Sequence, residues 1–228
     1  MSNPKQLTFP WNKSNKSKFD NFYFESSNIE AKDALLASGD IFLYGLEKTG
    51  KTYLLQSLCN YYFNEGKTSL FMPLKEVRDL GSQITESLES LDLICIDDID
   101  LIAGDNSWEI AIFNLINDSL LSNCRLVFCS SFNLSNINFE LKDLISRIKK
   151  INHIELFPVN TNNLSKAIKF IANSRSINLG EREIDYLITY SERSIANLVN
   201  IIKKLDDLSM ELKRKISVPL IKEVILAE

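Results

Sequence analysis

The stretch "GLEKTGKT" (Gly45 to Thr52) decides how the rest of the chain is interpreted. It matches the pattern GxxxxGK[ST], follows the apolar run "DIFLYG" directly, and opens an amphipathic helical pattern. That strand–loop–helix context makes the match specific. Since the amide groups of such a loop and the N-terminus of the next helix surround phosphate groups, we expect Lys51 to reach the terminal phosphates and Thr52 to bind Mg²⁺.

A second motif supplies acidic groups. The run "LICIDD" (93–98) ends in Asp97 and Asp98 after four apolar residues. We expect Asp97 to hold Mg²⁺ through water and Asp98 to orient or deprotonate an attacking water. A carboxylate pair at a strand end is by itself typical of a solvated turn, but the phosphate-binding loop in the same chain favours nucleotide binding. Hydrolysis by the chain itself is left open.

The arrangement of apolar runs predicts the fold class. Strand-like runs alternate with helical patterns, and strands that are buried on both faces and separated by helices imply a parallel α/β sheet. From about Val159 only helical patterns follow, and Ser217 with Pro219 marks one helix start. The expected strands are 40–45, 68–73, 91–98, 125–131 and 153–157, and the expected helices between them are 51–63, 74–91, 107–121 (capped by Ser107 or Asn106) and 139–150.

Composition excludes several classes of protein. The net charge of −4 and pI of about 5.3 argue against strong direct binding to DNA, which needs a basic face. No apolar run approaches the ~18 residues of a membrane helix, and no signal peptide is visible. The four cysteines lack CxxC spacing, and two of them, Cys95 and Cys129, lie in apolar runs. They are typical of reduced core residues, so we expect a cytoplasmic protein. A single histidine makes a zinc site or a histidine triad improbable.

Two further features are typical of AAA+ P-loop proteins. The fourth expected strand ends in Ser130 and Ser131, where such proteins place a sensor of the γ-phosphate. Arg147 in "DLISRI" stands where they carry an arginine finger that acts on a neighbour's nucleotide. The alternatives are a strand-end turn and an ordinary surface cation.

Several segments together resemble a known family. They are "FDNF" (19–22), "FLYG" with "TGKTYLLQSLCNYY", "LICIDDIDLIAGD" with "WEIAIFNLIND", "DLISRI" and "ISVPLIKEVIL". They are similar to the AAA+ region of DnaA initiators and, more closely, to the shorter Hda family of DnaA regulatory inactivators. The resemblance implies an AAA+ P-loop fold with a five-stranded parallel sheet and a small C-terminal helical lid. The expected segments are a tail at 1–18, an α/β nucleotide-binding subdomain at 19–158 and a lid at 159–228.

The resemblance also implies a site for ADP or ATP with Mg²⁺. Asp98 would act in catalysis, Arg147 would be the arginine finger, and Thr52 with Asp97 would hold the metal. The sensor-2 arginine of relatives falls at Ala196, and Arg193, three residues earlier on the expected helix, is a candidate substitute. The nucleotide-binding set comprises Phe22, Gly45, Thr49, Gly50, Lys51, Thr52, Ser131 and Arg193.

The pentapeptide "QLTFP" (Gln6 to Pro10) stands in an otherwise polar tail. It is similar to the motif by which Hda proteins dock into the hydrophobic groove of the DNA polymerase sliding clamp (its β subunit). The resemblance assigns Gln6 to a polar pocket, Leu7 and Phe9 to apolar pockets, and Pro10 to stiffening the peptide. The alternative is a hydrophobic staple that packs the tail back onto the body.

The expected function is a negative regulator of DNA replication initiation. Tethered to the clamp, it would stimulate hydrolysis of ATP bound to DnaA through Arg147, with the main role of activating a partner's ATPase. We expect a monomer or a weak homo-oligomer, associated with the nucleoid through the clamp. A helicase loader or a truncated initiator is the alternative, although a loader would carry a larger N-terminal region and an initiator would continue beyond Glu228 into a DNA-binding domain. An independent ATPase is a further alternative because Asp98 is retained.

Overall fold

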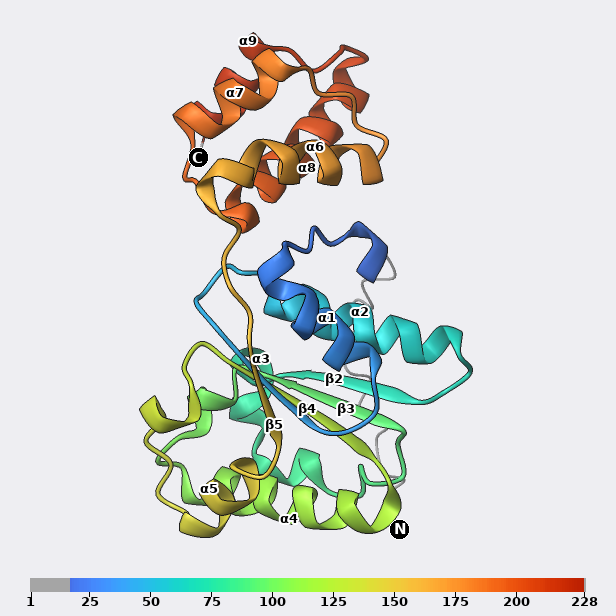
Figure 1. Ribbon diagram of the computed structural model, residues 1–228, viewed down its shortest axis with the longest axis vertical. Helices are drawn as coiled ribbons and strands as arrows, with labels where there is room; N and C mark the ends of the chain where they lie inside the picture. The colour runs from blue at the N-terminus through green and yellow to red at the C-terminus, as the bar shows by residue number, and fades with distance from the viewer. Residues whose placement is uncertain (1–16, 228) are drawn as a thin grey trace, which may run out of the picture.

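The computed structural model describes residues 17–227, in which a parallel sheet is followed by a helical lid (Figure 1). The strand order is β2-β3-β4-β1-β5, and every pairing is parallel. The predicted five-stranded parallel sheet is therefore confirmed. The strands are β1 (Ile41–Tyr44), β2 (Ser69–Pro73), β3 (Leu93–Asp97), β4 (Arg125–Ser130) and β5 (Asn152–Glu155).

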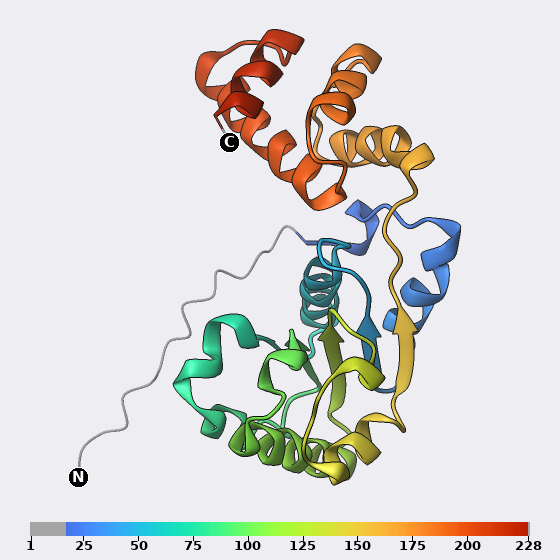
Figure 2. The ribbon, with the colours of Figure 1, turned by 90° about the vertical axis from the view of Figure 1, so that its left-hand side faces the viewer.

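Helices cover both faces of this sheet (Figures 1 and 2). On the side nearer the lid lie α1 (Ile29–Leu36) and α2 (Lys51–Asn64), and on the far side lie α4 (Asn106–Ser122) and α5 (Lys142–Ile148). Successive strand residues point to opposite faces. Thus Leu93 and Cys95 belong to one apolar core with α1 and α2, while Ile94 and Ile96 belong to another with α4. The continuous apolar run of β3 serves both cores.

Two local predictions in this part are wrong. The stretch after β2 contains only the four-residue helix α3 (Leu74–Val77) and short 3₁₀ turns, not one helix to residue 91. Gly81, with φ of +92°, follows the first of these turns, a conformation that L side chains rarely adopt and that a continuing helix cannot contain. Helix α4 is capped by Asp105, whose carboxylate accepts hydrogen bonds from the Ser107 and Trp108 amides.

The lid has an apolar core of its own. Its helices pack around buried leucines and isoleucines, including Leu187, Leu198 and Ile201. Ser217 occupies the position just before the last helix, where its side chain makes no capping hydrogen bond, and Pro219 stands in the first turn, so the predicted helix start is confirmed. The helices are α6 (Leu164–Ser174), α7 (Glu181–Tyr190), α8 (Ile195–Leu212) and α9 (Val218–Leu226).

The chain joins the lid to the α/β body through residues 156–160. Asn28 fixes this connection, because its amide nitrogen donates to the Phe157 carbonyl and its oxygen accepts from the Phe157 amide, both at 2.9 Å. The Tyr23 ring packs on Phe170 of α6, with 5.7 Å between the ring centroids. The N-terminal segment before α1 therefore contacts the first lid helix.

Two observations concern features that composition raised. Among residues 17–227, no helix is long and apolar enough to cross a membrane. Cys95 and Cys129 are buried and unbridged. The tail residues Gln6, Leu7, Phe9 and Pro10 lie outside the described residues.

Candidate nucleotide site

The loop between β1 and α2 has the backbone of a phosphate-binding loop. Gly45 and Gly50 have φ of +152° and +99°, values at which a side chain would be strained. A Cβ on Gly45 would lie 2.3 Å from the Leu156 carbonyl oxygen, and one on Gly50 would lie 2.7 Å from the Phe22 ring. Both glycines of the GxxxxGK[ST] pattern are thus required by close contacts.

Backbone carbonyl groups of this loop accept hydrogen bonds from two of its side chains, Lys51 and Thr49. The Lys51 ammonium donates to the Gly45 and Leu46 carbonyls, at 2.8 Å each, and is only 6% exposed. The Thr49 hydroxyl donates to the Leu46 carbonyl at 2.9 Å. The positive charge of Lys51 is therefore fixed at the N-terminus of α2, where the helix dipole also favours an anion.

Thr52 and Asp97 meet, as the two motifs predict. The Thr52 hydroxyl donates to Asp97 Oδ2 at 2.6 Å. The other oxygen, Asp97 Oδ1, is buried and has no N–H or O–H donor among the described residues. The neighbouring Cys129 thiol adds no second charge, because burial and then the charge of Asp97 raise its pKa.

This pair fits Mg²⁺ of the kind that is bound together with nucleotide phosphates. A hydroxyl and a carboxylate are oxygen ligands, and Mg²⁺ usually keeps several waters and phosphate oxygens beside one or two carboxylates. A buried carboxylate oxygen without a donor is a group that a cation or its water would satisfy. Among residues 17–227 no cluster of three or more histidine, cysteine or acidic side chains offers a fuller cage.

Asp98 points to the pocket from the end of β3. Its backbone is left-handed, with φ of +57°, which Asp tolerates better than most residues. Burial, together with the negative charges of Asp97 and Asp100, raises the pKa of its carboxyl group. A raised pKa brings a carboxylate closer to the range in which it can accept a proton from water.

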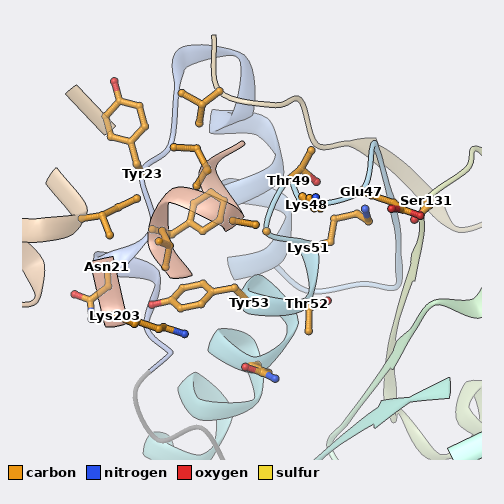
Figure 3. A pocket seen from close by; sticks show the side chains of 18 of the residues that line it. Asn21, Tyr23, Glu47, Lys48, Thr49, Lys51, Thr52, Tyr53, Ser131 and Lys203 are labelled. Carbon is orange, nitrogen blue, oxygen red and sulfur yellow. The ribbon is translucent and has the colours of Figure 1, made fainter. Parts of the chain in front are cut away.

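A pocket of about 590 Å³ lies between this loop and the lid (Figure 3). In the close-up, Lys51, Thr52 and Ser131 lie toward one end, and Asn21, Tyr23 and Lys203 toward the other. The full lining comprises Asn21, Phe22, Tyr23, Glu47, Lys48, Thr49, Gly50, Lys51, Thr52, Tyr53, Gln56, Lys75, Asp98, Ser131, Val159, Ile171, Arg175, Ile195, Ala196, Val199 and Lys203.

The charge and shape of this lining suit a polyanion with a flat apolar part. Lysine or arginine stands at five of these positions and glutamate or aspartate at two, although the whole chain carries a net charge of −4. The Phe22 ring lies against Gly50 and 6.0 Å from the Tyr53 ring centroid. Aromatic and aliphatic groups therefore stand beside the cationic ones.

Ser130, the last residue of β4, and Ser131, which follows it, have different surroundings. Ser130 is fully buried, and its hydroxyl donates to Asp100 at 2.7 Å while accepting from the Phe132 amide. Ser131 lines the pocket, and its amide donates to Asp100. Of the two serines, Ser131 is thus the one that lines the pocket.

Arg193 does not reach the pocket. The expectation placed it on the same helix as Ala196, but α8 begins at Ile195 with Ser194 as its cap. Arg193 precedes the helix, is exposed, and donates from Nε to the Ile188 carbonyl at 3.3 Å. The proposed i, i+3 relation therefore fails, while Ala196 itself lines the pocket.

Arg147 also lies outside this lining. It belongs to α5, on the side of the sheet away from the lid (Figures 1 and 2), and its guanidinium carbon lies 6.0 Å from the Phe113 ring centroid of α4. The fully buried Glu109 carboxylate holds the start of α5, because it accepts hydrogen bonds from the Glu140 and Leu141 amides. Arg147 therefore lies on a helix whose start is fixed by Glu109, and it does not line the chain's own pocket.

Besides Ala196, the lid contributes two basic residues to the pocket that no sequence motif indicates. Arg175, at the C-terminal end of α6, and Lys203, on α8, carry no motif and reach the lining because the lid packs over the loop. Lys75 follows β2 in a stretch with no phosphate-binding pattern. Among the lining residues that were not predicted, Glu47 and Lys48 lie within the GxxxxGK[ST] motif and Tyr53 directly follows it, so the motif could have indicated these three.

Comparisons with known proteins agree with this architecture. The family described as "Hda, lid domain" matches residues 162–225. A Haemophilus influenzae protein described as uncharacterised is 26% identical over 227 residues, which cover 97% of this chain and 98% of that protein.

Solved structures of DnaA share the fold. Domain III of the replication initiation protein DnaA from Thermotoga maritima matches with a TM-score of 0.79 and 20% identity, covering 95% of this chain and 97% of that one. AMPPCP-bound DnaA from Aquifex aeolicus matches with a TM-score of 0.71 and 20% identity; the match covers 84% of this chain but only 65% of that DnaA. Residues 162–225 thus match the lid-domain family of Hda, and the structure as a whole has the fold of DnaA domain III.

Proposed function

We propose that the chain binds an adenine nucleotide, ADP or ATP, together with Mg²⁺ between the P-loop and the lid. The observation that carries this proposal is the meeting of the two motifs, in which Thr52 donates to Asp97 at 2.6 Å while Asp97 Oδ1 is buried and has no N–H or O–H donor among the described residues. Lys51 and the loop amides take the phosphates, and the metal neutralises phosphate charge when it is bound. The AMPPCP bound to Aquifex aeolicus DnaA supports the proposal by analogy of fold.

At the other end of the pocket, the base is expected to pack among apolar groups. Phe22, Val159 and Ile171 supply such groups from the N-terminal segment, the connection and the lid. A flat ring gains from aromatic and aliphatic contacts of this kind. Ser131 would contact the terminal phosphate, and Asp98 would hold the attacking water if the chain hydrolyses its own nucleotide.

We further propose that the protein regulates DnaA, switching off initiation by stimulating hydrolysis of DnaA-bound ATP. The position of Arg147 supports this, because an arginine outside its own pocket, on a helix held by Glu109, can act on the nucleotide of a neighbour. A guanidinium that reaches a partner's γ-phosphate stabilises charge that develops in the transition state.

The tail would bring the regulator to its place of action. We propose that Gln6, Leu7, Phe9 and Pro10 dock into the sliding clamp, and that the protein acts on DnaA while so tethered. Burial of Leu and Phe side chains contributes about 1.5–3 kcal/mol each, less the cost of ordering the tail, so a weak to moderate attachment is expected.

Three measurements test these parts separately. Thermal shift with ADP or ATP and Mg²⁺ tests the nucleotide site, and no shift with either nucleotide would show it to be vestigial. Clamp pull-down with Gln6→Ala plus Leu7→Ala tests the tail. Binding should disappear while the melting temperature stays unchanged, whereas a lower melting temperature would indicate a staple onto the body. Conversion of DnaA-bound ATP to ADP on clamp-loaded DNA tests the regulatory role.

An ATPase that works on its own nucleotide is the second candidate, and Asp98 at the pocket favours it. Steady-state hydrolysis by the purified chain without DnaA distinguishes the two. Turnover that is abolished by Asp98→Asn would support an independent ATPase.

A further inference from the structure

The P-loop and the lid are joined by an ion pair beside the pocket. The Lys48 ammonium lies 2.9 Å from Glu192 Oε1 and 3.0 Å from Oε2. Lys48 is a variable position of the GxxxxGK[ST] loop, and Glu192 lies in the turn between α7 and α8. Residues 144 apart in sequence are thus brought together only by the packing of the lid.

The loop geometry turns Lys48 toward the lid. Its backbone is left-handed, with φ of +62°, between the two glycines of the loop. Besides the nucleotide pocket, Lys48 lines a smaller adjoining groove with Ala196, Val199 and Lys203 of α8. The first two turns of α8 therefore lie next to the P-loop at the point where the ion pair is formed.

Glu192 is a charged residue that lies close to the start of α8. The hydrogen bond with Lys48 is the main reason why the pKa of Glu192 is lowered, so the contact favours the charged carboxylate. Glu192 stands two residues before Ser194, whose hydroxyl accepts from the Asn197 amide and caps α8. Because Glu192 is so close to the start of α8, movement of that helix away from the loop must stretch the pair.

We propose that Lys48 and Glu192 are a positioning pair, which holds the lid against the P-loop and sets how long a nucleotide stays bound. The inference rests on the proposed nucleotide site and adds a means of regulating it. Ile195, Ala196 and Val199 line the pocket from the first turns of α8, which begins three residues after Glu192. A nucleotide that leaves between loop and lid must separate them from the loop. The pair opposes the movement of α8 away from the loop and takes no part in any chemical step.

The size of the effect follows from exposure. The two side chains are 52% and 56% exposed, so water and salt weaken their attraction. Exposed ion pairs of this kind change an equilibrium by at most about fivefold. We therefore expect nucleotide release to become about two- to fivefold faster when the pair is broken, and high salt to reduce the difference.

The experiment is stopped-flow release of a fluorescent N-methylanthraniloyl-ADP, chased with excess ADP in Mg²⁺ buffer. Glu192→Gln is the cleanest variant, because Glu192 does not line the pocket. Lys48→Gln and the double variant complete a mutant cycle, and the exchange Lys48→Glu with Glu192→Lys restores a pair of reversed sign. Glu211→Gln, an exposed carboxylate near the far end of α8, is the matched control.

The proposal expects faster release in both single variants, no further increase in the double variant, partial restoration in the exchange, and no change in the control. Unchanged release in Glu192→Gln would overturn it, and so would slower release, which would mean that Lys48 binds the nucleotide once freed. If the wild-type chain fails to bind the probe at all, the nucleotide site itself is wrong. In that case, thermal unfolding of the same two single variants and the double variant tests whether the pair couples the lid to the body. Additive effects of the two substitutions would refute the positioning pair.

Discussion

The two halves of the pocket are built in different ways. The half from the α/β body is built mainly on two short sequence motifs, and the polar groups of Lys51 and Asp97 in these motifs are buried and held by short hydrogen bonds. The half from the lid uses residues from several helices, and its Arg175 and Lys203 are set by the packing of the lid over the loop. We infer that the body half fixes the phosphate chemistry and that the lid half adjusts how tightly and how long the ligand is held.

The largest expected effect is that of substituting Arg147, which tests whether the α/β body acts on a nucleotide outside its own pocket. Arg147→Ala should remove most of the stimulation of DnaA-bound ATP hydrolysis while nucleotide binding and clamp binding persist. Arginine fingers supplied in trans raise turnover by about 10³–10⁵ in GTPases, and we expect a smaller factor here. The measurement is conversion of DnaA-bound ATP to ADP with wild-type and variant side by side.

Arg147→Lys sharpens that test. It keeps a cation over Phe113 but loses the planar fork that contacts phosphate oxygens, so it should fail like the alanine variant. Lys149→Ala, an exposed cation just after the same helix, is the control. Full stimulation by Arg147→Ala would make this residue a surface cation.

Lys51→Ala should remove most of the nucleotide's effect on stability, because the variant lacks the fixed charge at the N-terminus of α2. A ligand at about 100-fold its dissociation constant adds about 2.7 kcal/mol to the free energy of unfolding. Thermal unfolding with and without ADP and Mg²⁺ measures the gain. An undiminished gain in the variant would place the nucleotide elsewhere.

Lys203→Gln tests the lid half, and its expected effect is smaller. The residue is exposed on α8 and lines the end of the pocket away from Lys51 (Figure 3), so its attraction to the phosphates acts over a longer distance and is screened. Affinity for ADP should fall by about two- to fivefold, as for other exposed charge pairs. Isothermal titration calorimetry measures the dissociation constant for ADP in this variant and, for comparison, in Lys51→Ala. If the lid variant lost as much affinity as the loop variant, the division between the two halves would be mistaken.

Asp98→Asn should give the smallest effect, a slight gain in stability of the nucleotide-free chain at neutral pH. Burial and the charges of Asp97 and Asp100 raise the pKa of Asp98 in the folded state, so its ionised form opposes folding. The cost is present above the folded pKa and disappears as the pH falls below the unfolded value near 3.8. Melting temperatures from pH 4 to 8 should therefore show a difference that grows with pH, and a constant difference would contradict the assignment.

The sequence by itself determined the sheet and the phosphate half of the pocket. The run of β3 is apolar at every position between Leu93 and Ile96 because the strand is buried on both faces, and the glycines of the loop are required by positive φ and close contacts. Thr52 and Asp97 could be paired in advance, because the start of α2 and the end of β3 meet at one edge of a parallel sheet. These features depend on local backbone geometry, which short motifs encode.

Most of the lid half depends on tertiary packing. Arg193 lies outside the pocket because α8 begins at Ile195, and helix boundaries are poorly marked in a sequence where a serine cap can stand at several positions. Arg175, Lys203 and the pairing of Lys48 with Glu192 depend on how a separately packed helical unit rests on the P-loop. Contacts between residues so far apart in the chain follow from the packing of two apolar cores, and no local pattern records them.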